Sequence, residues 1–182
     1  MKLFLGINLP EDAIQKVYEQ TDPIRRDYPD FNWVPTDNLH VTLYHIGEVA
    51  DTKIPLVVEY VENSIYDVEK THLFARATDL FINTKQIILY MSFLRNKVIE
   101  DVHERMLTLF EDKSTKKYIP HLTMARYKIP SKQQYFHLKK KLHDLDVELD
   151  FSVTQIHLYQ SIDRARNPLY NIIKSFPLQD KL

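Results

Sequence analysis

The stretch NLHVTLYHIG, residues 38–47, contains the pattern His-x-Thr within an alternation of apolar and polar side chains. The stretch IPHLTMARYK, residues 119–128, contains the pattern again, with an apolar residue between His and Thr and another after the Thr. Alternation with a period of two indicates a half-buried β-strand. The repeat therefore predicts two matching strands and suggests an internal duplication.

Successive side chains of a strand point to opposite faces, so His40 and Thr42 should share one face of the first strand. By the same rule His121 and Thr123 should share one face of the second. A neutral imidazole can accept a proton and an imidazolium can donate one, while hydroxyl groups can donate to phosphate oxygens. If duplication brings the two pairs to one cleft, they suit phosphate chemistry without a metal. The alternative is that both are ordinary half-buried strand residues.

The rest of the chain reads as paired strands separated by amphipathic helices. Strands are expected at residues 2–8, 32–35, 39–47, 72–82, 86–93, 117–128, 151–162 and 169–176. Helices are expected at residues 9–20, 55–70, 96–112 and 131–145. This order favours an α+β fold with an antiparallel sheet and helices on its outer faces.

The composition excludes several classes of protein. The chain has 182 residues, two glycines and no cysteine, so glycine-rich phosphate loops, disulfides and thiolate metal sites are excluded. The net charge is −1, so any contact with nucleic acid should be local. No stretch approaches the roughly 20 apolar residues of a membrane span. The opening reads as a strand meeting a helix rather than a secretion signal, and we expect a cytoplasmic protein.

Two segments resemble the signatures of a known family. NWVPTDNLHVTLYHIGEV (residues 32–49) and PHLTMAR (residues 120–126) look like the motifs of the two-histidine phosphoesterases, specifically the RNA 2',3'-cyclic phosphodiesterases also called 2'-5' RNA ligases. The resemblance covers nearly the whole chain. It implies one domain, residues 1–182, with two interleaved pseudo-symmetric lobes of antiparallel sheet, outer helices and a central cleft.

The resemblance also implies an activity. His121 would act as proton acceptor and activate water for attack on an RNA 2',3'-cyclic phosphate, and His40 would act as proton donor to the leaving 3' oxygen, giving a 2'-phosphate end. With an RNA 5'-hydroxyl as nucleophile, the same site would form a 2'-5' linkage. Thr42 and Thr123 would bind the phosphate. The resemblance implies RNA or an oligonucleotide with a 2',3'-cyclic phosphate end as the partner, and no need for ATP. We also expect no cofactor, no metal and a monomer.

Four further residues are candidates for the site. Arg126 matches the arginine that binds phosphate in the family, but it lies an odd five residues after His121, so a β-bulge or strand end must intervene. His45 stands where many relatives carry phenylalanine, which makes base preference a point of difference. Tyr44, which simple parity places on the His40 face, and Trp33 are the other possible base-stacking residues.

Other readings stay open. A phosphodiesterase acting on 2'-5' oligoadenylate or another cyclic nucleotide ester uses the same residues, and a non-catalytic module that binds RNA ends uses the same cleft. The run KSTKK, residues 113–117, is either an RNA entrance or a solvated face. The remaining histidines match no zinc spacing.

Overall fold

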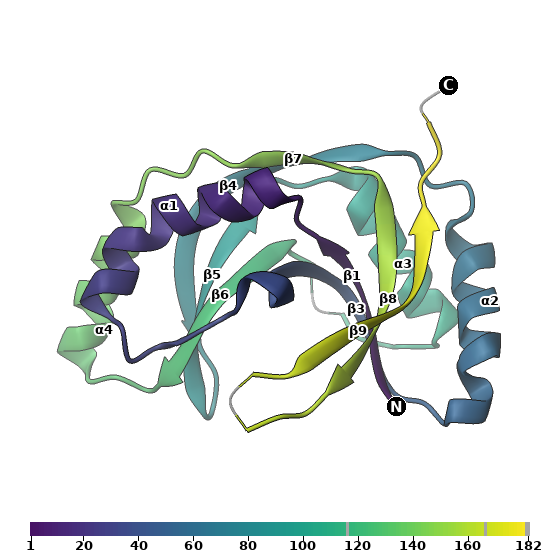
Figure 1. The fold of residues 1–182 in the computed structure, drawn as a ribbon, viewed down its shortest axis with the longest axis horizontal. Helices are drawn as coiled ribbons and strands as arrows, with labels where there is room; N and C mark the ends of the chain where they lie inside the picture. The colour runs from purple at the N-terminus through teal and green to yellow at the C-terminus, as the bar shows by residue number, and fades with distance from the viewer. Residues whose placement is uncertain (116, 166, 181–182) are drawn as a thin grey trace.

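The computed structural model describes residues 1–115, 117–165 and 167–180. Within these residues, four α-helices accompany nine strands, and the strands form one antiparallel sheet (Figure 1), which confirms the α+β prediction. The helices are α1 (Glu11–Asp27), α2 (Ile54–Ile65), α3 (Lys97–Leu109) and α4 (Lys132–His143). The strands are β1 (Lys2–Asn8), β2 (Asn32–Trp33), β3 (His40–Glu48), β4 (Thr71–Ile82), β5 (Gln86–Phe93), β6 (His121–Lys128), β7 (Asp150–Val153), β8 (Gln155–Ile162) and β9 (Leu169–Pro177).

Local signals explain where the helices begin. The Asn96 side chain caps α3 by accepting a hydrogen bond from the amide of Ile99. A capping box opens α4: the Ser131 hydroxyl accepts from the Gln134 amide, and the Gln134 side chain accepts from the Ser131 amide. These bonds satisfy amide groups that a helix start otherwise leaves without partners.

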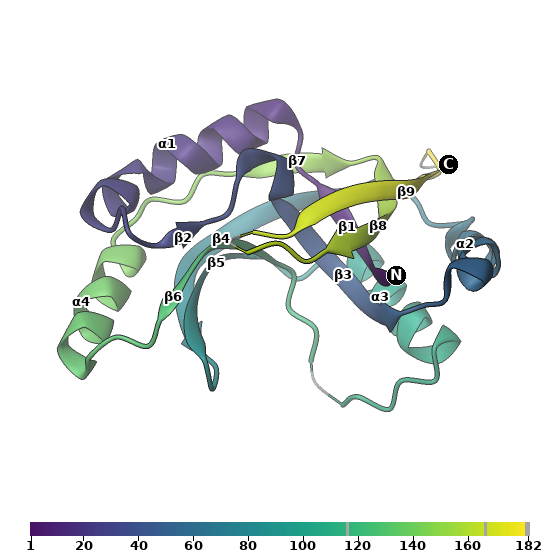
Figure 2. The ribbon, with the colours of Figure 1, turned by 60° about the horizontal axis from the view of Figure 1, so that its bottom comes forward.

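The sheet has two halves that meet at its centre. Its strand order is β7-β4-β5-β6-β3-β1-β8-β9, with β2 added beside β6. We call β7, β4, β5, β6 and β2 the β6 lobe, and β3, β1, β8 and β9 the β3 lobe. In Figures 1 and 2, α1 and α4 accompany the β6 lobe, whereas α2 and α3 accompany the β3 lobe. Each lobe therefore takes segments from distant parts of the chain.

The two lobes touch along a short seam. β3 and β6, the strands that carry the two His-x-Thr motifs, pair through one register partner on each, Val41 and Leu122. Both side chains are 0% exposed. On either side of the seam each strand pairs along most of its length with its other neighbour, β1 or β5. The motif strands are thus held side by side at one point and diverge beyond it.

One expected strand is divided. The sequence predicts a single strand over residues 151–162, but β7 ends at Val153 and β8 begins at Gln155. β7 pairs with β4 at one end of the sheet, whereas β8 pairs with β1 near the other end. Between them, the carbonyl of Thr154 accepts a hydrogen bond from the Leu178 amide at 2.9 Å. Strand periodicity is local and does not reveal that the partner strand changes at Thr154.

The seam leads to a prediction about stability. Leu122→Ala should lower the free energy of unfolding by about 2–5 kcal/mol, because it leaves a cavity in a fully buried contact. The matched control is Leu94→Ala, whose side chain is 49% exposed and which should cost no more than about 0.5 kcal/mol. Urea denaturation measures both. An equal loss of unfolding free energy in the two variants would contradict the conclusion that the contact between Val41 and Leu122 stabilises the fold.

Candidate active site

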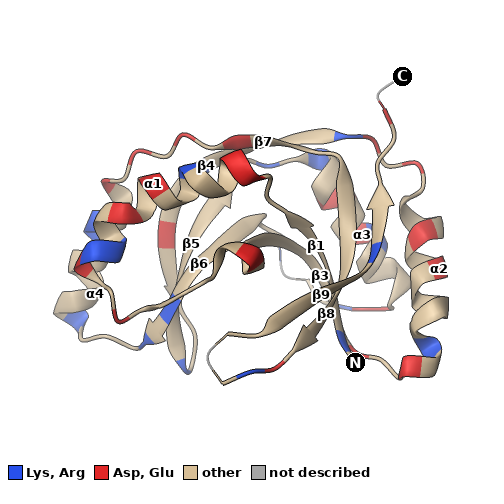
Figure 3. Ribbon diagram, viewed as in Figure 1, with Lys and Arg blue, Asp and Glu red and all other residues tan. Residues whose placement is uncertain are grey.

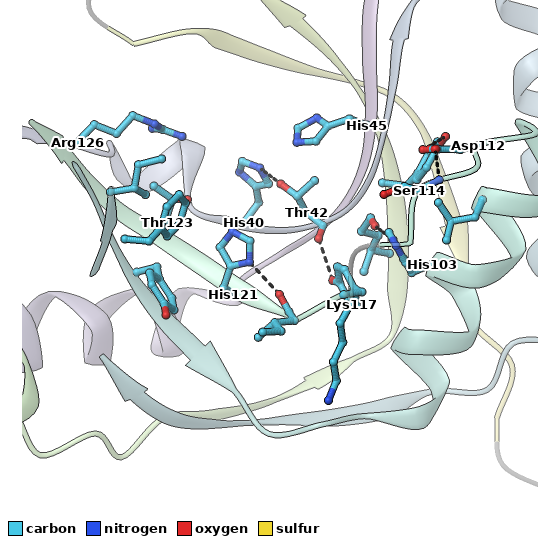
Figure 4. A pocket seen from close by; sticks show the side chains of 18 of the residues that line it. His40, Thr42, His45, His103, Asp112, Ser114, Lys117, His121, Thr123 and Arg126 are labelled. Carbon is cyan, nitrogen blue, oxygen red and sulfur yellow. Dashed lines mark hydrogen bonds between the residues drawn. The ribbon is translucent and has the colours of Figure 1, made fainter. Parts of the chain in front are cut away.

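A cleft of about 610 Å³ opens where β3 and β6 diverge. His40 and Thr42 from β3 and His121 and Thr123 from β6 line it together (Figure 4). The structure therefore brings both motif pairs to the walls of one cavity. Its volume is typical of a small-molecule site.

The two imidazoles are oriented in the same way. Nδ1–H of His40 donates to the carbonyl of Asn38 at 2.7 Å, and Nδ1–H of His121 donates to the carbonyl of Ile119 at 2.9 Å. In each case the acceptor lies two residues earlier in the chain. Because a carbonyl can only accept, the proton of a neutral ring is on Nδ1 and Nε2 carries the lone pair. Nε2 of His40 accepts from the Thr42 hydroxyl at 2.9 Å.

His40 lies against an aromatic cluster. Three rings pack near its imidazole, with 5.0–6.2 Å between ring centroids: Phe4, Tyr159 and Tyr170. Burial lowers the pKa of His40 to about 4, the hydrogen bond to Asn38 opposes that shift, and the positive charges of His45, Arg126 and His121 add to it. At neutral pH the His40 imidazole of the free protein is therefore uncharged.

A β-bulge brings Arg126 to the cleft, as the odd spacing requires. β5 and β6 pair with Tyr90 opposite Thr123 and Leu89 opposite Ala125, so Met124 is an extra residue. The bulge reverses the alternation, and Arg126 joins Thr123 on the cleft wall. Figure 4 shows its guanidinium on the same side of the cleft as Thr123.

The first motif strand has an equivalent bulge. Along β1, Gly6 pairs with Thr42 and the preceding residue, Leu5, pairs with Tyr44, so Leu43 is the extra residue. His45 consequently takes the cleft position that Arg126 takes in β6.

The expectation that Tyr44 lies on the His40 face is wrong, because simple parity ignores this bulge. The Tyr44 side chain is 8% exposed and its ring stacks on Phe110, with 5.5 Å between centroids. Its hydroxyl donates to Asp112 at 3.2 Å. Tyr44 therefore contributes to the floor at one end of the cavity, and its ring face is already covered.

Trp33 is not brought to the cleft. Its Nε1–H donates to the carbonyl of Tyr28 at 3.0 Å, and the guanidinium of Arg25 lies 4.4 Å from the centre of its ring. Trp33 is absent from the residues that line the cavity. The ring packs beside the core of the β6 lobe, which removes it from the base-stacking candidates.

Two residues that sequence reasoning missed support β3 where β6 leaves it. The Tyr118 hydroxyl donates to the carbonyl of Thr42 at 2.8 Å, and Nδ1–H of His103 donates to the carbonyl of Leu43 at 2.7 Å. The two rings stack on each other, with 4.4 Å between centroids. These two side-chain hydrogen bonds take the place of those that a neighbouring strand would make to the carbonyls of β3. No motif marks either residue, because the contact depends on the divergence of the strands.

Gly6 lets β1 approach the backbone of the first motif closely. A Cβ at this position would lie 3.2 Å from the carbonyl oxygen of Val41 and 3.4 Å from Cδ2 of His40. The close approach of β1 to β3 at the first motif thus uses the smallest residue. One of the chain's two glycines is therefore part of the support of the site.

Charged residues of both signs occur throughout the part of the chain that the structure describes. In Figure 3 both signs are spread over the helices and the edges of the sheet. From the run KSTKK, Lys117 lines the cleft, and Lys116 lies outside the described residues. Among the described residues no group of three or more His, Cys, Asp or Glu side chains is placed to hold a metal ion. No described helix is long and apolar enough to cross a membrane.

Comparison with known proteins agrees with this geometry. Residues 10–165 match the family model of the 2'-5' RNA ligase superfamily. The chain belongs to this superfamily. It is 25% identical over 181 residues to an RNA 2',3'-cyclic phosphodiesterase of Methanocaldococcus jannaschii, with 97% of this chain and all of that protein covered. A Thermotoga maritima protein of the same name is 23% identical, with 95% of this chain and 93% of that protein covered.

Solved structures of similar proteins share the fold of this superfamily member. TT0787 of Thermus thermophilus superposes with a TM-score of 0.79 at 21% identity over the full length of both chains. E. coli LigT in complex with 3'-AMP superposes with a TM-score of 0.73 at 19% identity, with 98% of each chain covered.

The support of β3 can be tested by removing one oxygen atom. Tyr118→Phe should lower the free energy of unfolding by about 1–3 kcal/mol, because it leaves the part-buried Thr42 carbonyl without its donor. Tyr60→Phe is the control, since Tyr60 is 46% exposed on α2 and should be near neutral. Thermal or chemical denaturation distinguishes them. A stability of Tyr118→Phe equal to that of the control would exclude a supporting role for the hydroxyl.

Proposed function

We propose that this protein hydrolyses RNA 2',3'-cyclic phosphate ends to 2'-phosphate ends, with His40 and His121 as its acid and base. One observation carries the proposal: two imidazoles, each oriented by a backbone carbonyl two residues earlier, line one cleft together with two threonine hydroxyls. The full-length similarity to proteins named RNA 2',3'-cyclic phosphodiesterase supports the same activity.

The proposed reaction has one proton moving at each histidine. Nε2 of His121 takes a proton from water as the water oxygen attacks phosphorus. The bond from phosphorus to the 3' oxygen breaks on the opposite side, and Nε2 of His40 protonates that oxygen. The products are a 2'-phosphate and a 3'-hydroxyl. The attacking and leaving oxygens lie roughly in line, so the acid and the base must stand on opposite sides of the phosphorus.

Three further groups would hold the phosphate. The Thr42 and Thr123 hydroxyls can donate to the non-bridging oxygens, and the planar fork of Arg126 can donate two parallel bonds. Charge on these oxygens grows as phosphorus becomes five-coordinate, so donors fixed beforehand stabilise the transition state. In the free protein the Thr42 hydroxyl donates to Nε2 of His40. This hydrogen bond must break when the substrate binds, so that the hydroxyl can donate to the phosphate.

The low pKa of His40 is consistent with a proton donor that becomes protonated only when the substrate binds. The active site needs one proton shared by the two histidines. In the free protein burial keeps that proton away from His40. A phosphate anion beside Nε2 favours the imidazolium form and draws the proton to His40, where the leaving oxygen needs it.

His45 is the residue that would set this protein apart in substrate choice. It occupies the position in β3 that Arg126 occupies in β6, and it lines the cleft. Burial, together with the charges of Lys2 and His121, lowers its pKa. An uncharged imidazole can stack on a base and accept or donate one hydrogen bond.

Three further statements complete the proposal. The protein would act as a monomer, without a metal or other cofactor, in the cytoplasm, whose reducing conditions suit a chain without cysteine. Hydrolysis of 2'-5' oligoadenylate or another cyclic nucleotide ester is the second candidate, and comparing turnover of these substrates separates the two. A non-catalytic module that binds RNA ends would not need both oriented imidazoles.

Removal of either histidine tests the chemistry. With a 2',3'-cyclic-phosphate oligonucleotide in EDTA, His40→Ala and His121→Ala should each lower kcat by about 10²–10⁴-fold. His72→Ala is the matched control, because His72 is a strand histidine outside the cleft. Product is measured as the 2'-phosphate. Undiminished turnover in either variant, or its loss in EDTA for the wild type, would contradict the proposal.

The pKa of His40 sets the acid limb of the pH profile. The pair is inactive when both rings are protonated, and that state forms only when His40 also gains its proton, at a pH of about 4. Because the shift is downward, kcat/KM should hold as the pH falls below the ordinary histidine value of about 6.5 and decline only near 4. A decline centred near 6.5 in protein that remains folded would contradict this.

A further inference from the structure

Asn38 makes two hydrogen bonds beside the first motif, one through its backbone and one through its side chain. Its carbonyl accepts from Nδ1–H of His40 at 2.7 Å. Its side-chain amide donates to the carbonyl of Pro168 at 2.7 Å, across 130 residues of the chain. Asn38 ends the short 3₁₀ helix η1 (Thr36–Asn38), whereas Pro168 directly precedes β9. One residue thus connects His40, the proposed proton donor, to the segment that leads into β9.

The same two segments also meet at the His40 ring. Tyr170, two residues after Pro168, packs edge-on against the imidazole, with 5.1 Å between ring centroids. Asn38 stands two residues before His40, so each segment contributes both to the hydrogen bond and to the ring contact. The imidazole is therefore held between a carbonyl of one segment and an aromatic ring of the other. The side chain of Asn38 fastens these two segments together.

Little room remains behind the His40 ring. Asn38, Pro168 and Tyr170 line a space of about 10 Å³ beside it. A space of this size holds about one water molecule at most. Asn38 is absent from the described residues that line the wide cleft. Its side chain thus helps to close the back of the ring without a place in the proposed substrate site.

The second motif restrains its histidine in another way. There the accepting carbonyl belongs to Ile119, and Pro120 stands between that residue and His121. The proline ring restricts the backbone at its own position and at the residue before it. The first motif has Leu39 at the corresponding position, which lacks such a ring. The side-chain hydrogen bond of Asn38 supplies a restraint there that the apolar side chain of Ile119 cannot make.

We propose that Asn38 is a positioning residue for the proposed proton donor. By tying η1 to the segment before β9, it keeps its own carbonyl on Nδ1 of His40 and leaves Nε2 facing the cleft. The proposal rests on the proposed function, which gives His40 its role, but the state of the ring can be measured without a substrate. When the side-chain bond is lost, the two segments can separate. The carbonyl then no longer fixes the tautomer, and water reaches the back of the ring.

Asn38→Leu tests the proposal, because leucine keeps the branched shape of the side chain and cannot donate. For a 2',3'-cyclic-phosphate oligonucleotide, kcat should fall by about tenfold or more with little change in KM, since a displaced acid slows the reaction without weakening binding. The acid limb of kcat/KM should move up from about 4 toward the ordinary histidine value of about 6.5. Water at the ring relieves the desolvation that lowers the pKa of His40, which is the reason for this direction.

Nitrogen-15 NMR of labelled histidine reads the His40 ring directly. At neutral pH the wild type should show a protonated Nδ1 and an unprotonated Nε2. In Asn38→Leu the same signals should report a mixture of the two tautomers. The loss of these signals in His40→Ala assigns them to His40.

Gln20→Ala is the matched control. The Gln20 side chain donates to the carbonyl of Glu148 at 2.7 Å, across 128 residues of the chain and away from the cleft. This variant therefore loses a long-range bond of the same kind. Its kcat, its pH profile and its His40 tautomer should equal those of the wild type. Circular dichroism and the denaturation midpoint show whether each variant is folded.

Each result decides the question. Wild-type kcat, acid limb and tautomer in folded Asn38→Leu would overturn the proposal, and so would equal changes in Gln20→Ala, which would reflect a general loss of stability. If Asn38→Leu does not fold, Asn38→Ala decides by the same criteria. Absence of turnover in the wild type would refute the proposed function, whereas the tautomer would still show whether Asn38 positions the ring.

Discussion

The contact between Val41 and Leu122 is the constraint on which the site depends. It places two motif strands side by side in one sheet, and because pairing stops there, the strands diverge and leave a cleft between them. The residues next to this pair in each motif are histidine and threonine, so an apolar contact on one face of the sheet fixes the position of the proposed catalytic groups on the other. Tyr118 and His103 bond the carbonyls that the divergence exposes. The same two strands therefore contribute to the core with one face and to the proposed site with the other.

The two halves of the site are alike in backbone and different in chemistry. Each motif strand bulges one residue after its threonine, and each bulge turns a side chain into the cleft. The strand β6 presents Arg126, a permanent cation, whereas β3 presents His45, whose charge depends on its surroundings. The aromatic cluster packs on His40. These differences make the surroundings of the two histidines unequal, as the proposed roles of His40 as proton donor and His121 as proton acceptor require.

Sequence reasoning reached the parts of this structure that depend on local pattern. Strand periodicity placed His40 and His121 on comparable strands, and the odd spacing of Arg126 required the bulge that the pairing of β5 and β6 shows. Sequence reasoning failed where the position of a side chain depends on segments that are distant in the chain. Tyr44 was assigned to the wrong face because no local signal marked the second bulge, and Trp33 is covered by Arg25 from the first helix. The break at Thr154 and the roles of Tyr118 and His103 depend on partners that only the folded chain supplies.

The direct passage from β7 to β8 through Thr154 has a consequence for binding entropy. These two strands belong to different lobes, so the lobes are joined by a covalent link of one residue as well as by the seam between β3 and β6. This short link, the seam and the other crossings of the chain between the lobes together restrict how far one lobe can move relative to the other. A cleft of restricted width loses little conformational freedom when a ligand enters, and more of the contact energy then remains available as affinity. Such a cleft selects substrates by how well they match its dimensions, rather than by closing around them.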